Sequence, residues 1–401
     1  MTGPPKPTLF TGDFILLGVV LAFVSAMMAL FFQFQSYLMS LGIDPRWHGF
    51  LLGSDAITGV VLQPLMSPYL NAKNAKKVLV AGICVMAAAL ASYSHAVTAG
   101  AITLVRIVHG GGFVASVAAM MALFSGYIPR SRSGEAIGII SIMRLLPYAI
   151  VPPVVVYLSH GAGDFTSVLT AAAVVTALVL IPVAFVRPAP GGEEASEKSV
   201  GLSGLLENIR SVPVVMLLVV NVLFYSSYTI LFFFLRDFGA LRGIGNPGFF
   251  FTVAMFVMIV IRLGGSRYFD RLNKARTGAF CMALLAVFHV LVYFVRLEAW
   301  FLGFSVIFGV LWGVGIPLIM AFVFDISEPR FRGLNMNLVL VVMQVAFFVG
   351  PLVGGIVLAD WGYGPLFTLC GILNMAGAIL LFGVRGKSVS GFRSQVSGSK
   401  T

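Results

Sequence analysis

The sequence has few charged residues for its length. Asp, Glu, Lys and Arg make up 10% of the 401 residues, whereas hydrophobic residues make up 59%. A soluble globular domain has about 25% charged residues, because its surface must remain in contact with water. The composition therefore excludes an ordinary soluble protein and indicates a chain that is surrounded by lipid.

Cysteine is also rare, and its spacing carries no chemical motif. Cys84, Cys281 and Cys370 lie in apolar stretches, so we expect buried apolar side chains rather than a disulfide framework or a metal site. A nucleophile elbow, a phosphate-binding loop, metal-ligand spacing and a paired-carboxylate motif are all missing from the sequence. We therefore expect no enzyme activity, no cofactor and no metal ion, and a membrane enzyme is the disfavoured alternative.

Acidic residues are outnumbered by basic ones, which gives a net charge of +11. If both termini are cytoplasmic, most Lys and Arg residues lie in cytoplasmic segments, and the outer loops contain only Arg46, Arg236, Arg242 and Arg296. This asymmetry follows the positive-inside rule and explains the charge without a nucleic-acid partner. It predicts a multi-pass protein of the cytoplasmic (inner) membrane, with both termini in the cytoplasm.

Long apolar runs occupy most of the chain, and most of them reach the ~20 residues that a helix needs to cross a bilayer. They are continuous rather than alternating, which excludes membrane strands. The first run lacks a small-residue cleavage site and therefore indicates a retained helix, not a signal peptide. The runs lie at about 14–40, 47–70, 77–96, 100–124, 134–158, 165–187, 213–236, 247–269, 276–295, 299–324, 334–358 and 364–384.

The two halves of the chain resemble each other at a constant offset of 199 residues. Pro152 corresponds to Pro351, and Gly49 corresponds to Gly248. A parallel repeat of six apolar segments is an architecture that secondary transporters use. We therefore expect an all-α membrane protein with twelve transmembrane helices in two six-helix bundles.

The domain boundaries follow from the runs and from the polar segments between them. We expect an N-terminal six-helix bundle at 1–187 and a C-terminal six-helix bundle at 213–386. Residues 188–212, rich in Pro, Gly and Glu, form the predicted cytoplasmic linker. Its two alternative conformations are a short helix on the membrane surface and a plain loop. Residues 387–401, rich in Ser and Gly, form the predicted disordered cytoplasmic tail.

Three segments resemble motifs of the major facilitator superfamily. Residues 262–271 read Arg-Leu-Gly-Gly-Ser-Arg-Tyr-Phe-Asp-Arg, which is similar to the acidic and basic loop signature of that family. Residues 106–112 resemble its membrane-embedded arginine motif, and residues 350–355, Gly-Pro-Leu-Val-Gly-Gly, resemble its Gly-Pro motif. The resemblance covers essentially the whole chain and implies the major facilitator fold.

A finer resemblance is to bacterial efflux-type members, which export drugs or metabolites. It rests on Arg106-Ile-Val-His-Gly and on Gly134-Glu-Ala-Ile-Gly at the start of the fifth run. The first cytoplasmic loop departs from the family pattern, since Asn71 stands where the family has Asp and Ala72 where it has Arg. The fifth run ends in Pro152-Pro153, where antiporter-like members usually have Gly-Pro.

Asp55 is the one acidic residue that the sequence places deep inside a predicted span. It lies ~12 Å below the outer surface at 1.5 Å per residue, where a lone carboxylate is costly. Its pKa rises on desolvation and falls beside a cation, so changing solvent access could load and unload a proton. The alternative is a hydrated polar residue near the mouth of a cavity.

Three further ionisable residues lie in the same half, so we assign proton coupling to Asp55, Arg106, His109 and Arg144. The family resemblance gives Arg106 a role in proton coupling or substrate binding, and pairing with backbone carbonyls is its alternative. For His109 a satisfied helix-packing histidine is the favoured interpretation. Arg144 could bind an anionic group or pair with Asp55.

The second half offers aromatic and amide side chains instead of charges, an arrangement that suits an amphiphilic organic ligand. Packing or contact with lipid is the alternative for each aromatic residue. The predicted substrate-binding residues are Gln33, Gln35, Arg144, Asn221, Tyr225, Tyr228, Trp312 and Gln344.

Residues at the cytoplasmic ends are candidates for gating. The resemblance implies that Asp270 meets the positive end of the fifth helix near Gly134 and latches the closed cytoplasmic side. The other predicted gating residues are Arg271, Arg262, Asn71, Asp325 and Arg332. The Gly309-xxx-Gly313 and Gly350-xxx-Gly354 spacings predict close approach of helix backbones.

We therefore expect a secondary active transporter that moves a small organic solute by alternating access, by proton-coupled efflux. We expect it to act as a monomer in the lipid bilayer, with the solute and protons as its partners and no nucleic acid. Import or facilitated exchange of an organic anion, suggested by Arg106 and Arg144, is the alternative. A non-transporting sensor also remains open.

Overall fold

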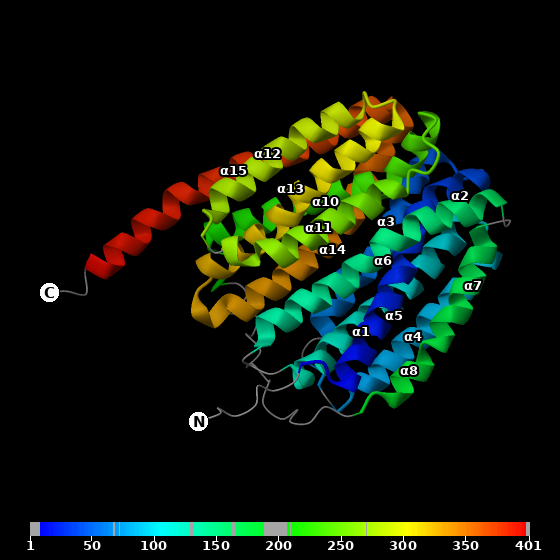
Figure 1. Ribbon diagram of the computed structural model, residues 1–401, viewed down its shortest axis with the longest axis horizontal. Helices are drawn as coiled ribbons and strands as arrows, with labels where there is room; N and C mark the ends of the chain where they lie inside the picture. Colours follow the sequence, from blue (N-terminus) through cyan, green and yellow to red (C-terminus); the bar gives the residue numbers. More distant parts are fainter. Residues whose placement is uncertain are drawn as a thin grey trace. The chain divides into compact units, whose positions relative to one another are not determined.

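The computed structural model describes residues 9–66, 69–71, 73–128, 132–161, 165–187, 207–208, 210–269 and 271–397. All regular structure within these residues is helical (Figure 1). Eleven helices of the described part are long and apolar enough to cross a membrane, and the apolar helical segment Phe249–Gly265 is shorter. The predicted all-α membrane fold is therefore confirmed.

The helices before the connector belong to the first half of the chain. They are α1 (Gly12–Ala29), the 3-10 turn η1 (Leu30–Gln33), α2 (Phe34–Ser40), α3 (Pro45–Met66), α4 (Ala75–Ser92), the 3-10 turn η2 (Tyr93–His95), α5 (Ala99–Tyr127), α6 (Ser133–Gly161), α7 (Phe165–Leu178) and α8 (Leu180–Phe185).

The second half repeats the order of these elements. Its helices are α10 (Val212–Leu241), α11 (Phe249–Phe269), α12 (Lys274–Val292), α13 (Glu298–Ile326), the 3-10 turn η4 (Pro329–Phe331), α14 (Arg332–Trp361) and α15 (Tyr363–Ser397). Both bounds of α13 lie 199 residues after those of α5, and α14 likewise begins 199 residues after α6. The internal repeat in the sequence is thus a repeat of helices.

The contacts divide the chain into two compact units. Unit 1 comprises Met1–Gln33 and Ile57–Glu197, and unit 2 comprises Phe34–Ala56 and Lys198–Thr401. The units differ from the two bundles expected from the repeat in one respect, because residues 34–56 belong to the first repeat but pack within unit 2. The first division falls at the end of η1, and the second lies in the middle of α3.

Unit 1 is a bundle in which small residues let helices approach closely. α4 packs along α5, and α1 packs along α6. A Cβ atom added at Gly112 of α5 would lie 2.8 Å from the carbonyl oxygen of Gly82 on α4. Nearby, the Ser116 hydroxyl donates to the Gly112 carbonyl at 2.8 Å, so this polar side chain is satisfied inside its own helix.

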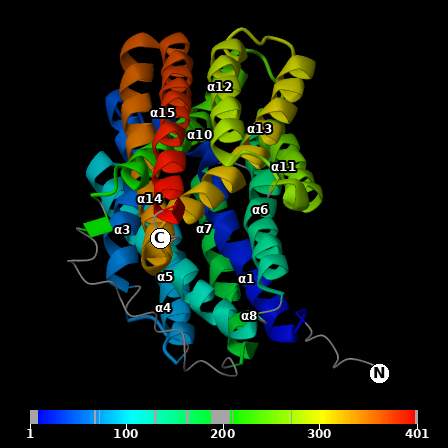
Figure 2. The same ribbon diagram turned by 90° about the vertical axis from the view of Figure 1, so that its left-hand side faces the viewer.

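In unit 2, as in unit 1, glycine residues let neighbouring helices approach closely. α10 packs against α14 and α15, α11 against α13, and α12 against α13 and α15, and Figure 2 shows α14 beside α15. A Cβ added at Gly309 of α13 would lie 2.5 Å from the Ala254 carbonyl oxygen, and one at Gly350 of α14 would lie 2.8 Å from that of Ser226. The predicted close approach at both glycine motifs is confirmed.

Polar residues fix several helix starts. The Thr11 hydroxyl accepts a hydrogen bond from the backbone N–H of Phe14 at 3.2 Å, and Thr98 caps α5 in the same way at 3.3 Å. The side chain of Asn273 accepts from the N–H of Arg276 at 3.0 Å at the start of α12. Each cap satisfies a backbone donor that has no partner within its helix.

Four details differ from the sequence expectations. The first apolar run is divided by η1, since residues 30–33 form a 3-10 turn between α1 and α2. α10 continues past the expected end of its run and stops at Leu241, followed by Gly243 with a φ of 75°. Residues 387–397, assigned to a disordered tail, continue α15. Cys84, expected to be buried, is exposed on α4, whereas Cys281 and Cys370 are buried.

Candidate functional site

A buried cationic cluster lies in unit 1 where α5 passes η1. Arg106 is 0% exposed, and its guanidinium carbon lies 4.4 Å above the centroid of the Phe31 ring. The Phe31 ring is also 5.1 Å from the His109 ring and 5.6 Å from the Tyr93 ring, measured between centroids. A cation over an aromatic face gains electrostatic attraction that grows when both groups are desolvated. The cluster therefore stabilises a charge inside an apolar bundle.

His109 differs in one respect from the packing histidine expected. It is fully buried and its ring packs against Phe31 and Tyr93, but neither Nδ1 nor Nε2 has a hydrogen-bond partner. Its packing role is therefore correct, whereas the expectation that its polar atoms are satisfied is wrong. Its ring neighbours are Phe31 and Tyr93, whose centroids lie 5.1 and 6.2 Å from its own, so its contacts in this cluster are made ring against ring.

Asp55 lies on α3 and is buried, with 7% of its surface exposed. It belongs to the segment of the first repeat that packs in unit 2, whereas Arg106 and Arg144 belong to unit 1. Arg144 is half-buried on α6. The predicted coupling of these three groups stays a prediction.

The aromatic wall expected in the second half exists as a packed cluster of unit 2. Trp312 of α13 stacks on Phe224 of α10 at 4.1 Å between centroids, with 7° between the ring planes. Tyr225 and Tyr228 approach the same indole at 5.7 and 4.8 Å. Trp312 is 1% exposed, and its Nε1 has no hydrogen-bond partner. The cluster offers a buried indole N–H donor.

The predicted amide residues are spread over both units. Gln33, at the end of η1, is 5% exposed, and its Oε1 has no hydrogen-bond partner. Asn221 is also buried, but its Nδ2 donates to the Leu217 carbonyl one turn earlier at 2.8 Å. Gln344 is half-buried on α14. Asn221 is thus already partnered by its own helix.

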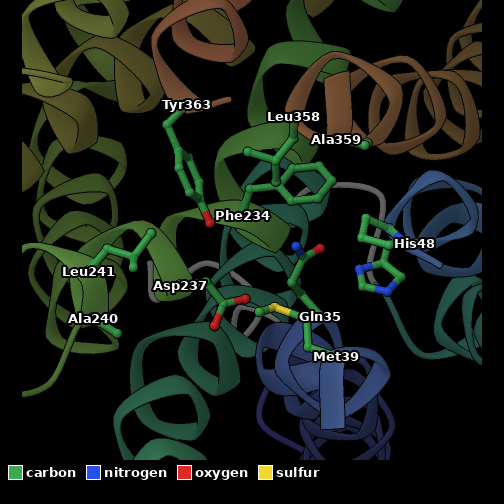
Figure 3. Close-up of a pocket in the computed structure, with 12 residues that line it drawn as sticks. Gln35, Met39, His48, Phe234, Asp237, Ala240, Leu241, Leu358, Ala359 and Tyr363 are labelled. Carbon is green, nitrogen blue, oxygen red and sulfur yellow. The ribbon is translucent and has the colours of Figure 1, made fainter. Parts of the chain in front are cut away.

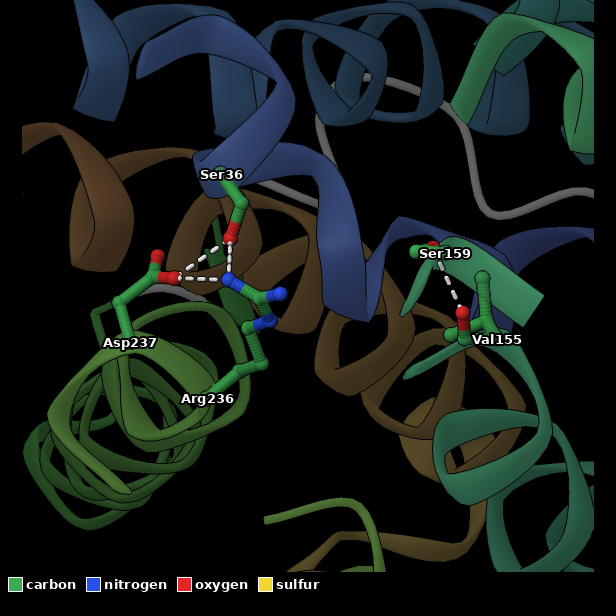
Figure 4. Close-up of polar contacts among 5 residues, drawn as sticks. All are labelled: Ser36, Val155, Ser159, Arg236 and Asp237. Carbon is green, nitrogen blue, oxygen red and sulfur yellow. Dashed lines mark hydrogen bonds and ion pairs between the residues drawn. The ribbon is translucent and has the colours of Figure 1, made fainter. Parts of the chain in front are cut away.

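Asp237 is a functional candidate that the sequence analysis missed. The seventh apolar run was expected to end at residue 236, whereas α10 continues to Leu241 and Asp237 is 6% exposed near its end. Its Oδ1 lies 2.6 Å from Nη1 of Arg236 and accepts from the Ser36 hydroxyl at 2.5 Å, and Arg236 also donates to Ser36 (Figure 4). The signal was present, since Phe234, Phe238 and Leu241 continue the apolar helical period around Asp237.

A cavity of about 530 Å³ adjoins this triad inside unit 2, at the end where α2, α3 and α15 meet α10 and α14 (Figure 3). The Gln35 amide, the Asp237 carboxylate and the Tyr363 hydroxyl point into it. Its lining residues are Gln35, Met39, Pro45, His48, Phe234, Asp237, Ala240, Leu241, Gly355, Leu358, Ala359 and Tyr363.

The predicted gating residues belong to both compact units, with Asn71 and Gly134 in unit 1 and Arg262, Asp325 and Arg332 in unit 2. Asp325 pairs with Lys274 at 2.5 Å rather than with Arg332, whose guanidinium lies 4.6 Å above the Phe324 ring. The Asn71 side chain accepts from the backbone N–H groups of Lys73 and Asn74 and so shapes its own loop.

The remaining gating residues are placed as follows. Gly134 lies in the first turn of α6, Arg262 is half-buried on α11, and Arg271 is exposed. Asp270 lies outside the described residues, so its contact with the fifth span stays a prediction.

Comparison with known proteins places the chain in a family. The model of the Major Facilitator Superfamily matches residues 15–325 and 248–399. Comparison with the sequences of curated proteins finds no match. Among solved structures, a point mutant of the nucleoside transporter NupG superposes with a TM-score of 0.76 at 14% identity, over 93% of this chain and 99% of that one. NupG itself has a TM-score of 0.73 at 12% identity, over 94% and 99%.

The chain therefore belongs to the Major Facilitator Superfamily, as the sequence motifs implied. It is a multi-pass membrane transporter whose partners are a small-molecule substrate and the lipid bilayer. The two structural matches share too little sequence with this chain to show more than the fold.

Proposed function

We propose that this transporter exports a small organic solute in exchange for protons, with Asp55 as the proton carrier. The observation that carries the proposal is a carboxylate, 7% exposed, in the middle of the apolar helix α3. Ionisable side chains inside membrane spans are costly and are retained mainly where they perform a function. Protonation removes that cost, so a cycle that alternately wets and buries Asp55 would bind and release a proton.

The solute is proposed to contact the aromatic cluster around Trp312 and Tyr228 in unit 2, and Gln33 of unit 1 is a separate candidate contact. Aromatic faces with a few unpartnered hydrogen-bonding groups are typical of sites for amphiphilic organic molecules. Trp312 and Gln33 both meet this description, since each buries a polar atom without a hydrogen-bond partner. Gln344 and Tyr225 remain candidates for the same role, whereas Asn221 is a weaker one because its amide is already bonded.

Import or facilitated exchange of an organic anion is the second candidate function. Its support is Arg144, which is half-buried on α6 and therefore accessible to a ligand. Arg106 supports it less, because the guanidinium is fully buried against the Phe31 ring. Nucleosides, which NupG is described as transporting, belong among the solutes to be screened on equal terms with organic anions.

The direction is tested with right-side-out and inverted vesicles that contain the purified protein. A ligand-dependent thermal-shift screen first identifies a solute that the protein binds. An imposed proton gradient should then drive that solute outward relative to the cell, into inverted vesicles. Gradient-driven accumulation in right-side-out vesicles, or accumulation that ignores the proton gradient, would contradict the proposal.

The carrier is tested with Asp55→Asn, which removes the charge but keeps the shape. We expect gradient-driven accumulation to fall to background while binding and downhill exchange persist, because only the protonation step is lost. Asp360→Asn is the matched control, since Asp360 is a more exposed carboxylate that pairs with Arg46 at 3.2 Å. Full accumulation by Asp55→Asn would eliminate Asp55 as the carrier.

A further inference from the structure

The cavity beside Asp237 combines apolar walls with buried acceptors that lack partners. Met39, Phe234, Leu241 and Leu358 provide apolar surface. Its volume of about 530 Å³ lies within the ~300–1,000 Å³ range of small-molecule sites. All the lining residues belong to unit 2, so the cavity is a property of one compact unit.

Among the described residues, two acceptor atoms at this cavity have no hydrogen-bond partner. They are Oδ2 of Asp237 and Oε1 of Gln35, and both are buried. The two residues are 6% and 4% exposed, and Figure 3 shows both side chains pointing into the cavity. A buried acceptor without a partner is destabilising, and the cost is larger for a charged one. A molecule that enters the cavity with its own hydrogen-bond donors would satisfy both acceptors.

The charge of the site is already balanced. The other carboxylate oxygen of Asp237 is held by Arg236, whose side chain is 14% exposed, and by the hydroxyl of Ser36 (Figure 4). His48 also lines the cavity, and its Nε2 lies 2.8 Å from the Ile43 carbonyl oxygen, so this nitrogen already has a hydrogen-bond partner. A charged ligand would add an uncompensated charge to a desolvated place, whereas an uncharged donor would not. Oδ2 would still accept a charge-assisted, and therefore strong, hydrogen bond.

We propose that this cavity binds an uncharged organic solute that carries hydroxyl groups on a ring with an apolar face. Asp237 and Gln35 accept hydrogen bonds from the hydroxyl groups, and Phe234 and Leu358 cover the apolar face. The site is separate from the aromatic cluster around Trp312. The inference rests on the role of the family in moving small solutes, and it is independent of proton coupling and of the direction of transport.

Binding is tested on the full-length protein in lipid nanodiscs, without any pH gradient. The probes are adenosine, uridine and phenyl β-glucoside, which are uncharged, and two charged analogues of adenosine. These are 5′-amino-5′-deoxyadenosine, a cation, and adenosine monophosphate, an anion. We expect at least one uncharged probe to bind, and the amine and the phosphate to bind at least tenfold more weakly than adenosine. Absence of measurable binding by all three uncharged probes would overturn the proposal, because the cavity would then hold water only.

Two variants locate the binding. Asp237→Asn should raise the Kd about tenfold or more, since a hydrogen bond to a charged acceptor is lost, and Gln35→Leu should raise it about fivefold. Gln35→Leu also keeps the test decisive if Asp237→Asn fails to fold because Arg236 loses its partner. Asp360→Asn is the control and should bind like the original protein, because Asp360 does not line the cavity.

Two further outcomes would contradict the inference, and one would support the location of the site. Equal affinity of the original protein and of both cavity variants would place the binding elsewhere in the molecule. Tighter binding of the amine than of adenosine, lost in Asp237→Asn, would make this a cation site and overturn the uncharged class. Loss of binding in Ala359→Trp, which fills the cavity from its exposed rim, would support the location.

Discussion

Individual side chains in this transporter bury polar atoms that their surroundings leave unsatisfied. The ring nitrogens of His109, Nε1 of Trp312, Oε1 of Gln35 and Oδ2 of Asp237 are all of this kind. Each costs stability in a folded protein, and the cost is not recovered by packing alone. For Trp312, Gln35 and Asp237 we attribute the loss to binding of a solute, whereas for His109 we do not.

His109 gives a prediction at this scale. His109→Leu should stabilise the protein by about 1 kcal/mol, because it replaces two unpartnered buried nitrogens by an apolar side chain of similar volume. Gradient-driven transport should persist if Asp55 is the proton carrier, as we propose. Thermal unfolding and vesicle transport measure the two effects.

His289→Leu is the matched control for His109. Nδ1 of His289 is hydrogen-bonded to the Leu285 carbonyl at 2.7 Å, so its removal should give less stabilisation or a loss. A stable His109→Leu protein that has lost proton-driven transport would show that His109, rather than Asp55, takes part in coupling.

At the scale of elements, the contact of α3 with α14 joins the first repeat to the second. A Cβ added at Gly355 would lie 2.5 Å from the Cα atom of Gly49, and one added at Gly53 would lie 2.8 Å from the Phe348 carbonyl oxygen. Two helix backbones in direct contact leave no room for a side chain between them. Gly49, Gly53 and Gly355 are therefore the residues that permit this close approach.

Gly355→Leu tests the contact between these elements. The leucine should push the helices apart by about 2 Å, the spread of interaxial distances that different contact residues produce. Spin labels at Trp47→Cys on α3 and Trp361→Cys on α14 measure the change, because both positions are exposed. Cys84→Ser is needed as the background, since Cys84 is exposed.

Gly303→Leu on α13 is the control for the substitution itself. A Cβ at Gly303 meets no atom within 4 Å, so leucine should leave the distance between the labels unchanged. An unchanged distance in Gly355→Leu as well would contradict the prediction, because the added side chain would then fit without moving α3 away from α14.

At the scale of the whole molecule, the distribution of basic residues predicts the orientation in the membrane. Two exposed positions test it in the same background. Leu241, 74% exposed at the end of α10, should be labelled as Leu241→Cys by a membrane-impermeant maleimide from outside the cell. Tyr69, 78% exposed in the first predicted cytoplasmic loop, should react as Tyr69→Cys only after the membrane is opened. The reverse labelling pattern would show that the protein has the opposite orientation in the membrane.

The sequence alone determined the fold class and the family, and it did so for a physical reason. A helix in lipid must satisfy its backbone internally and present an apolar surface, so spans are visible as continuous runs whatever their partners. The repeat was visible for the same reason, because equivalent spans such as α5 and α13 meet equivalent surroundings. The glycine motifs indicated close packing because only a missing side chain permits it.

Only the tertiary structure decided which polar residues meet. The apolar run placed Asp237 in a loop, whereas in the structure it lies within α10. Its hydrogen-bond partner Ser36 is about two hundred residues away in the sequence. Likewise, the rings of Phe31 on η1 and Tyr93 on η2 pack against His109, which the position of His109 on its own helix cannot reveal. Contacts between distant helices depend on side-chain packing in three dimensions, and the period of a single helix does not contain that information.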